Sequence, residues 1–120
     1  NPLAVAAGLV QLRLLKSDPG LYRRLEARAA AMESALQHEE VTVNRVGSMM
    51  TVFFTRGPVF DWMSASRSKT AAFARFFKAM LRAGIYLPPS QFEAWFVSAA
   101  HTEADIYRTI RASQRFLKSL

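Results

Sequence analysis

The segment "VTVNRVGSMMTVFFT", residues 41–55, decides the fold class because its periodicity differs from that of the sequence on either side. In its first half valines alternate with polar residues, and residues 52–54 are valine and phenylalanine, which are enriched in strands. Gly47 and Ser48 lie between the two halves and are typical turn residues. The segment therefore predicts a β-hairpin.

Two helices are predicted before this hairpin. Asn1 suits a helix N-cap, and Pro2 suits the first helical position because that position needs no amide hydrogen. The helix over residues 1–16 is apolar nearly all round, so we expect it to be covered on several sides, by material that is not in this chain. The sequence "SDPG", residues 17–20, ends it, and a second helix is expected over residues 21–37.

A loop over residues 56–66 and a third helix are predicted after the hairpin. Ser68 is the expected N-cap of this helix, and Gly84 is the residue expected to end it. Its apolar residues recur at the spacing of one helix face: Phe73, Phe76, Phe77, Met80 and Leu81.

The remaining sequence predicts two short strands, over residues 85–87 and 95–100, and a last helix. Thr102 and Asp105 have the spacing of a capping box at the start of that helix. Helices and strands mix without strict alternation. We therefore expect an α+β fold, a small antiparallel β-sheet packed with helices, in a single domain over residues 1–120.

Composition excludes several classes of function. Of the 120 residues 51% are hydrophobic, which permits a buried core, and the absence of cysteine excludes disulfides and thiolate metal sites. No apolar run approaches the roughly 18 residues of a membrane span, so no membrane partner is predicted. The net charge of +7 arises from basic residues that are spread between apolar positions, as on solvated helix faces. We therefore predict no nucleic-acid partner.

No complete catalytic motif is present. His38 with the acidic pair at residues 39–40, and His101 with Glu103, lack the spacing of metal ligands on one helix face, so no metal site is predicted. No nucleophile elbow and no glycine-rich phosphate loop occurs. One alternative remains open, in which Phe53 or Phe54 belongs to an RNA-binding sheet face.

Glu93 is the one carboxylate that the sequence singles out. It lies in "LPPSQFEAWFVSAAHTEAD", residues 87–105, after two prolines and among aromatic residues. Prolines stiffen the approach to this position, and an acid in such surroundings can point into a pocket. A solvated loop carboxylate is the other interpretation.

Four segments together resemble one enzyme family: "NPLAVAAGL", "VTVNRVGSMMTVFFT", "FARFFKAML" and "GIYLPPSQFEAWFVSAAHTEADI". In this order and at this spacing they resemble the C-terminal part of the glutamate-1-semialdehyde 2,1-aminomutases. The resemblance implies the small C-terminal domain of a fold-type I pyridoxal-phosphate enzyme that is a cytoplasmic homodimer, with the helix over residues 1–16 leading out of a missing large domain. The expected reaction converts (S)-4-amino-5-oxopentanoate, a small-molecule substrate, into 5-aminolevulinate for tetrapyrrole synthesis.

The resemblance also assigns roles to residues. The family's S-x-F-E-A loop reaches the substrate, so Glu93 is expected to bind substrate amino groups, with Ser90 and Phe92 as lining. The Schiff-base lysine and the pyridoxal 5'-phosphate site are expected upstream of Asn1, so no catalytic or cofactor-binding residue is assigned here. The chain alone is expected to be inactive. Another class III aminotransferase is the competing interpretation.

Overall fold

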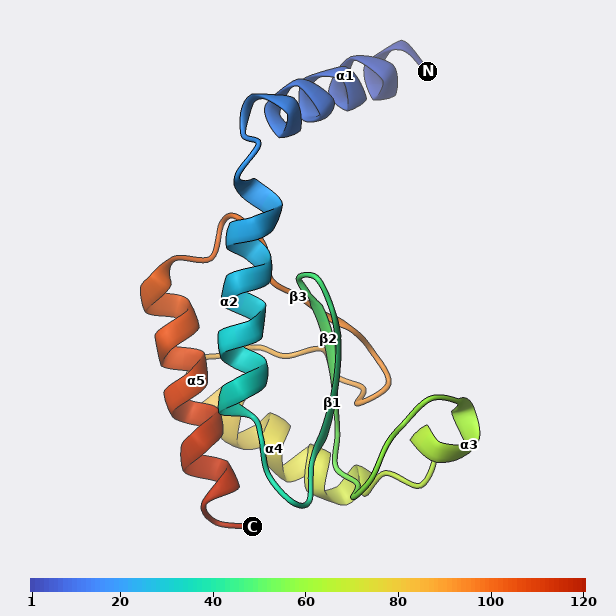
Figure 1. The fold of residues 1–120 in the computed structure, drawn as a ribbon, viewed down its shortest axis with the longest axis vertical. Helices are drawn as coiled ribbons and strands as arrows, with labels where there is room; N and C mark the ends of the chain where they lie inside the picture. The colour runs from blue at the N-terminus through green and yellow to red at the C-terminus, as the bar shows by residue number, and fades with distance from the viewer.

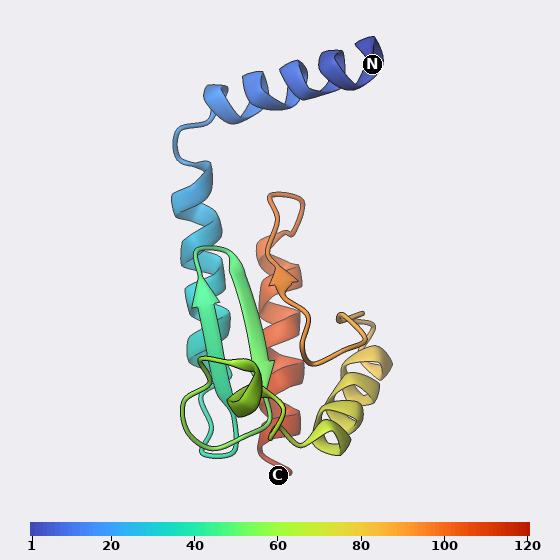
Figure 2. The ribbon, with the colours of Figure 1, turned by 90° about the vertical axis from the view of Figure 1, so that its right-hand side faces the viewer.

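The computed structural model describes residues 1–120 as five helices and one three-stranded antiparallel sheet. Helices α2 and α5 lie side by side against one face of the sheet, and the short helix α3 lies beyond the other face (Figures 1 and 2). This arrangement confirms the predicted α+β class. The elements in chain order are α1 (Pro2–Ser17), α2 (Leu21–Ala35), β1 (Thr42–Val46), β2 (Met49–Phe53), α3 (Trp62–Ala65), α4 (Thr70–Arg82), β3 (Trp95–Phe96) and α5 (Glu103–Leu117).

The predicted hairpin is confirmed as β1 and β2. These strands pair in register from Thr42 opposite Phe53 to Val46 opposite Met49. Gly47 has a φ of +57°, the left-handed conformation that a tight turn at this point requires and that glycine adopts at low cost. The sheet order is β1-β2-β3.

The two faces of the sheet have different surroundings because opposite residues of an antiparallel pair share a face. Met50, Val52 and Trp95 face the helices and are buried. On the other face Met49 pairs with Phe96, and both are exposed near the hairpin end. This second face therefore keeps apolar surface open to solvent.

The main core lies between the sheet and helices α2, α4 and α5. Phe76 on α4 is fully buried, and the ring of Phe54 packs against it at a centroid distance of 5.4 Å. Phe53 is buried separately, in a small cluster with Val59 and Ala65. Neither of the two consecutive phenylalanines is therefore available on an outer sheet face.

Helix α1 projects away from the rest of the chain (Figure 1). Asn1 caps it as predicted, because its side chain accepts a hydrogen bond from the Leu3 amide at 3.0 Å. No residue of α1 is buried within this chain, so the covering expected from its composition stays a prediction about contacts outside the chain. Six of its large apolar side chains are at least half exposed: Leu3, Val5, Leu9, Val10, Leu12 and Leu14.

Of the two strands predicted after α4, the first does not form and the second is shorter than expected. Residues 85–87 are not a strand, because the Ile85 amide donates to the Met80 carbonyl at 2.9 Å and so completes the end of α4 around Gly84, the residue after the C-cap. The strand expected over residues 95–100 is only Trp95–Phe96. It ends early because the Ser98 amide donates to the His101 ring instead of to a neighbouring strand.

Two helix predictions also need correction. The expected loop over residues 56–66 contains α3, which is capped by reciprocal hydrogen bonds between Asp61 and Ser64. The predicted N-cap Ser68 is wrong, since the Lys69 carbonyl accepts the first bond of α4 from the Phe73 amide and thus holds the N-cap position. The Thr102–Asp105 capping box at the start of α5 is confirmed.

Three arginines tie the elements together. Arg45 on β1 donates to Glu33 on α2 at 2.6 Å, and Arg28 on α2 donates to Glu103 at the start of α5 at 2.8 Å. Arg108 donates to the carbonyl at the α4 C-cap at 2.7 Å. No helix of the chain has both the length and the apolar character needed to cross a bilayer.

Candidate functional site

Glu93 lies in a turn that closes on itself. The Ser90 amide donates to the Glu93 Oε1 atom at 3.1 Å, and the Glu93 amide donates to the Ser90 carbonyl at 3.2 Å. The Phe92 amide donates to the Ser90 hydroxyl at 3.2 Å. These bonds orient the carboxylate of Glu93 and leave its Oε2 atom without a partner in this chain.

The exposed Glu93 carboxylate lines a hollow of about 400 Å³. The walls are mostly apolar and come from the segments before and after the turn, including Trp95, and from α2 and α5. Three other ionisable groups line the same hollow: His101, Asp105 and the phenol of Tyr86. The site therefore combines an apolar wall with two carboxylates, one imidazole and one phenol.

His101 and Asp105 each use one atom to hold the chain. The Nδ1 atom of His101 accepts a hydrogen bond from the Ser98 amide at 3.0 Å, which assigns the proton of the neutral ring to Nε2. The Oδ2 atom of Asp105 accepts bonds from the Thr102 hydroxyl and amide, which lower the pKa of the Asp105 carboxyl. Glu93 and Asp105 each keep one carboxylate oxygen unpaired, so the hollow suits a cationic group such as a primary ammonium.

Ser90 and Phe92 do not join Glu93 in this hollow. They line a second hollow of about 350 Å³ on α4, together with Phe77 and Lys78. The structure therefore brings the three predicted residues into one turn but points them toward two different spaces.

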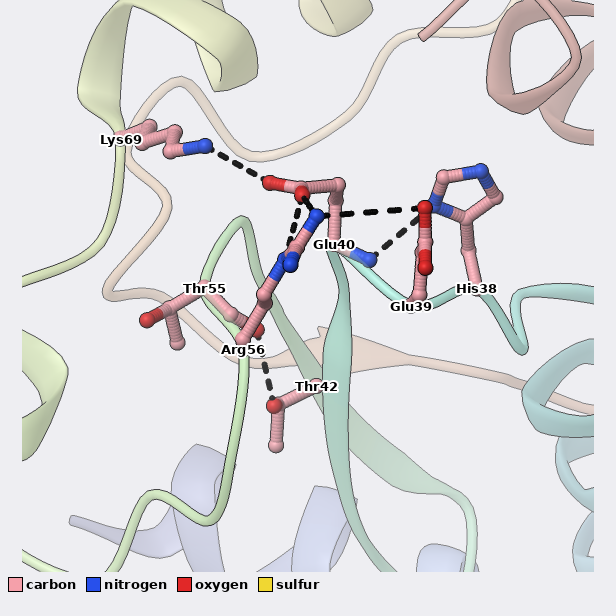
Figure 3. A network of polar contacts seen from close by, with 7 residues as sticks. All are labelled: His38, Glu39, Glu40, Thr42, Thr55, Arg56 and Lys69. Atoms are coloured by element: carbon pink, nitrogen blue, oxygen red, sulfur yellow. Dashed lines mark hydrogen bonds and ion pairs between the residues drawn. The ribbon is translucent and has the colours of Figure 1, made fainter.

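A second group of charged residues joins the start of β1 to the end of β2 (Figure 3). Glu40 accepts hydrogen bonds from Lys69, at 2.7 Å, and from Arg56, and the same guanidinium lies 3.9 Å from Glu39. The Lys69 ammonium and then the Arg56 guanidinium lower the pKa of the Glu40 carboxyl. Nearby, the Thr42 hydroxyl lies 3.0 Å from the carbonyl of residue 55 and shares its one proton between this carbonyl and that of Gly57, at 2.6 Å. The two carboxylates are thus engaged by cations, and this cluster fastens the sheet to the start of α4.

The chain has four lysines. None of them lines the Glu93 hollow, and Lys69 pairs with Glu40 as described. No group of three or more histidine, aspartate or glutamate side chains is placed to hold a metal ion.

Sequence reasoning missed one residue beside the turn. Trp62, the first residue of α3, packs on Phe92 with ring centroids 5.1 Å apart. The signal that could have found α3 is the pair Asp61 and Ser64, which have the N-cap and N3 spacing of a capping box.

Comparison with curated proteins gives one consistent name, and no protein-family model matches the chain. A glutamate-1-semialdehyde 2,1-aminomutase of Thermus thermophilus is 52% identical over 118 aligned positions, covering 93% of this chain and 28% of that protein. The protein of the same name from Myxococcus xanthus is 50% identical over 126 aligned positions, covering 100% of this chain and 29% of that protein. The chain thus spans less than a third of the length of these relatives.

Two solved structures share the fold. A glutamate-1-semialdehyde aminomutase variant from Pseudomonas aeruginosa, in complex with PMP, matches 85% of this chain with a TM-score of 0.73 and 17% identity. A β-phenylalanine aminotransferase from Variovorax paradoxus matches 89% of this chain with a TM-score of 0.60 and 23% identity. The chain covers 24% and 23% of these proteins, respectively.

Proposed function

We propose, since this chain belongs to the glutamate-1-semialdehyde 2,1-aminomutase family, that it is the C-terminal part of an enzyme that converts (S)-4-amino-5-oxopentanoate into 5-aminolevulinate. The support is sequence identity of 50% or more to relatives of that name over nearly the whole chain. The structural observation that supports the proposed substrate contact is the Glu93 turn. It presents an oriented carboxylate at a hollow with an apolar wall.

The proposed role of Glu93 is to bind an amino group of the substrate or of an intermediate. A carboxylate and an ammonium form a charge-assisted hydrogen bond, which is stronger than a neutral one. Because the Ser90 amide already holds Oε1, the carboxylate is oriented before ligand arrives and Oε2 is left for the ammonium. Holding the amino group in one position raises the effective concentration of the reacting groups. The proposed contribution of Glu93 is therefore orientation of the substrate.

The family implies pyridoxal 5'-phosphate as cofactor, a group that accepts an amino group and returns it. The residues around Glu93 do not fit this cofactor, because no lysine and no arginine lines the hollow and no glycine-rich loop borders it. We therefore propose that the cofactor is held by the rest of the complete protein, and we derive no step through it from this chain.

The open face of the sheet is the proposed contact with that rest of the protein. Val46, Met49 and Phe96 are exposed there, and the exposed apolar residues of α1 offer a second surface. Apolar patches of this kind mark contacts between protein surfaces. The homodimer and the cytoplasmic location stay predictions.

The two alternatives differ in what supports them. The RNA-binding alternative requires an outward Phe53 or Phe54, and both rings are buried, at 8% and 1% exposure. The alternative of an aminotransferase with another amino donor is supported by the fold alone, because the β-phenylalanine aminotransferase shares this fold.

The test of the proposed function is a product assay with the complete protein that contains this chain, loaded with pyridoxal 5'-phosphate. Incubation with glutamate-1-semialdehyde is expected to yield 5-aminolevulinate without any added amino donor. A matched reaction with pyruvate and common amino acids tests for transamination. Transamination in the absence of 5-aminolevulinate formation would assign the protein to the competing aminotransferase class.

A further inference from the structure

The segment between β2 and α4, residues 54–68, is firmly attached to the sheet although it contains little regular structure. The Thr42 hydroxyl donates to the Gly57 carbonyl at 2.6 Å, and the Asn44 side chain donates to the Val59 carbonyl at 2.7 Å. Val59 is also buried against the outer sheet face, in the small cluster described above. The segment can therefore serve as a fixed support for anything that packs on it.

This segment presents three large apolar side chains to solvent. Phe60, Trp62 and Met63 are exposed to 80%, 65% and 65%, so none of them belongs to the core. Only Trp62 has an aromatic partner, the Phe92 ring, at 5.1 Å and an interplanar angle of 56°. A tilted pair at this distance is an attractive geometry. Trp62 is thus the one exposed ring of the segment that reaches the Glu93 turn.

The same segment also holds the neighbouring residue of the turn. Gln91 is buried to all but 3% of its surface, and its side-chain amide lies 3.5 Å from the Ser68 carbonyl. Segment 54–68 therefore contacts two consecutive residues of the turn: Ser68 contacts the buried Gln91, and the exposed Trp62 contacts Phe92. Glu93 follows directly.

We propose that Trp62 is a positioning residue for Glu93, acting through Phe92. The inference rests on the proposed function, in which Glu93 binds a substrate amino group. Packing of the Trp62 indole on Phe92 favours the arrangement in which the Ser90 amide bonds the Glu93 carboxylate. Without the indole, the turn opens more often and Glu93 presents its carboxylate in the productive orientation for a smaller fraction of the time.

The size of the effect follows from the contact that is lost. An aromatic pair contributes enough to change a two-state population about two- to tenfold. The Trp62→Ala change is therefore expected to lower kcat/KM for glutamate-1-semialdehyde by up to about tenfold, because the closed fraction of the turn cannot fall by more than its closed-to-open ratio. The loss should fall on KM rather than kcat, because the apparent affinity falls with the fraction of enzyme that is competent to bind, and Trp62→Phe should restore most of it because a ring remains.

The experiment uses the complete protein with Trp62→Ala, Trp62→Phe and, as matched control, Phe60→Ala. Phe60 lies in the same segment and is more exposed but has no aromatic partner, so its removal should leave kcat/KM within twofold. If Trp62→Ala lost its fold by circular dichroism, Trp62→Leu would replace it, because leucine keeps apolar bulk without the ring. Equal kcat/KM for the Trp62 and Phe60 variants would overturn the inference.

Hydrogen exchange gives a second readout that does not depend on activity. The amides of Ser90 and Glu93 are both bonded within the turn, so their exchange should accelerate about two- to tenfold in Trp62→Ala and remain unchanged in Phe60→Ala. Unchanged exchange in Trp62→Ala would refute the role of Trp62 even in an active enzyme. Faster exchange in a protein that makes no 5-aminolevulinate would instead retain the role of Trp62 and reject the proposed function.

Discussion

Replacing Phe54 with alanine should cost this chain a large part of its stability. The Phe54 side chain is 1% exposed, and its ring packs between those of Phe73, Phe76 and Phe116 at centroid distances of 6.4, 5.4 and 6.1 Å. As the first residue after β2, it thereby joins the end of the sheet to both α4 and α5. Truncating a buried phenylalanine to alanine costs about 3–5 kcal/mol, because burial is lost and a cavity remains. A domain of this size has roughly 5–15 kcal/mol in total.

The assay is urea unfolding of the 120-residue chain followed by circular dichroism. With an m-value of about 1.5 kcal/mol/M, the midpoint should fall by roughly 2–3 M. Phe60→Ala is the control, since an 80% exposed ring should change the free energy of unfolding by less than about 0.5 kcal/mol. A Phe54 variant within about 1 kcal/mol of the control would refute the assignment of this ring to the core. It would also return Phe54 to the RNA-binding alternative.

Further expectations concern helix ends, pH and association. Thr102→Ala removes the N-cap of α5 and should lower the free energy of unfolding by about 1 kcal/mol in the same urea assay. Gly84→Ala should lower it by about 1–2 kcal/mol, because Gly84 has a φ of +77° and a side chain is strained there; an unchanged midpoint would contradict this. Hydrogen bonds from Thr102 lower the pKa of Asp105 in the folded state, so its stabilisation is present above about pH 4 and lost as the pH falls through the folded pKa. The free energies of unfolding of wild type and Asp105→Asn should therefore differ at pH 7, and the difference should shrink as the pH is lowered below about 4; a difference that does not change with pH would rule the effect out. The exposed apolar side chains of α1 should make the isolated chain self-associate, and Leu12→Ser should weaken this in sedimentation experiments, whereas a monomer at high concentration would count against it.

Features with a local physical cause could be predicted from the sequence. The Thr102–Asp105 capping box and the glycine turns at Gly47 and Gly84 depend on side chains and backbone angles within a few residues. The strand predictions after α4 were less successful because a strand needs a partner. Residues 85–87 have none, since the Ile85 amide is already used by the end of α4.

In the candidate site, too, local features could be predicted and contacts between distant segments could not. The turn that contains Glu93 could be anticipated from its prolines and from the family resemblance. The separation of Ser90 and Phe92 from the Glu93 hollow could not, because it depends on how the turn packs against α4. Trp62 was missed for a related reason. It lies 30 positions before Phe92, and a contact at that separation leaves no periodic signal in one sequence.

The most direct test of the central claim is the rate of 5-aminolevulinate formation by the complete protein, by its Glu93→Gln variant and by a Glu39→Gln control. Glutamine keeps the size of the Glu93 side chain and its bond from the Ser90 amide but removes the charge. Glu39 is an exposed glutamate, 3.9 Å from Arg56 and outside the Glu93 hollow. We predict an active parent, at least a tenfold lower kcat/KM for Glu93→Gln, and a Glu39→Gln variant within twofold of the parent. A Glu93→Gln enzyme that matches the parent would show that Glu93 is a solvated loop carboxylate with no part in substrate binding.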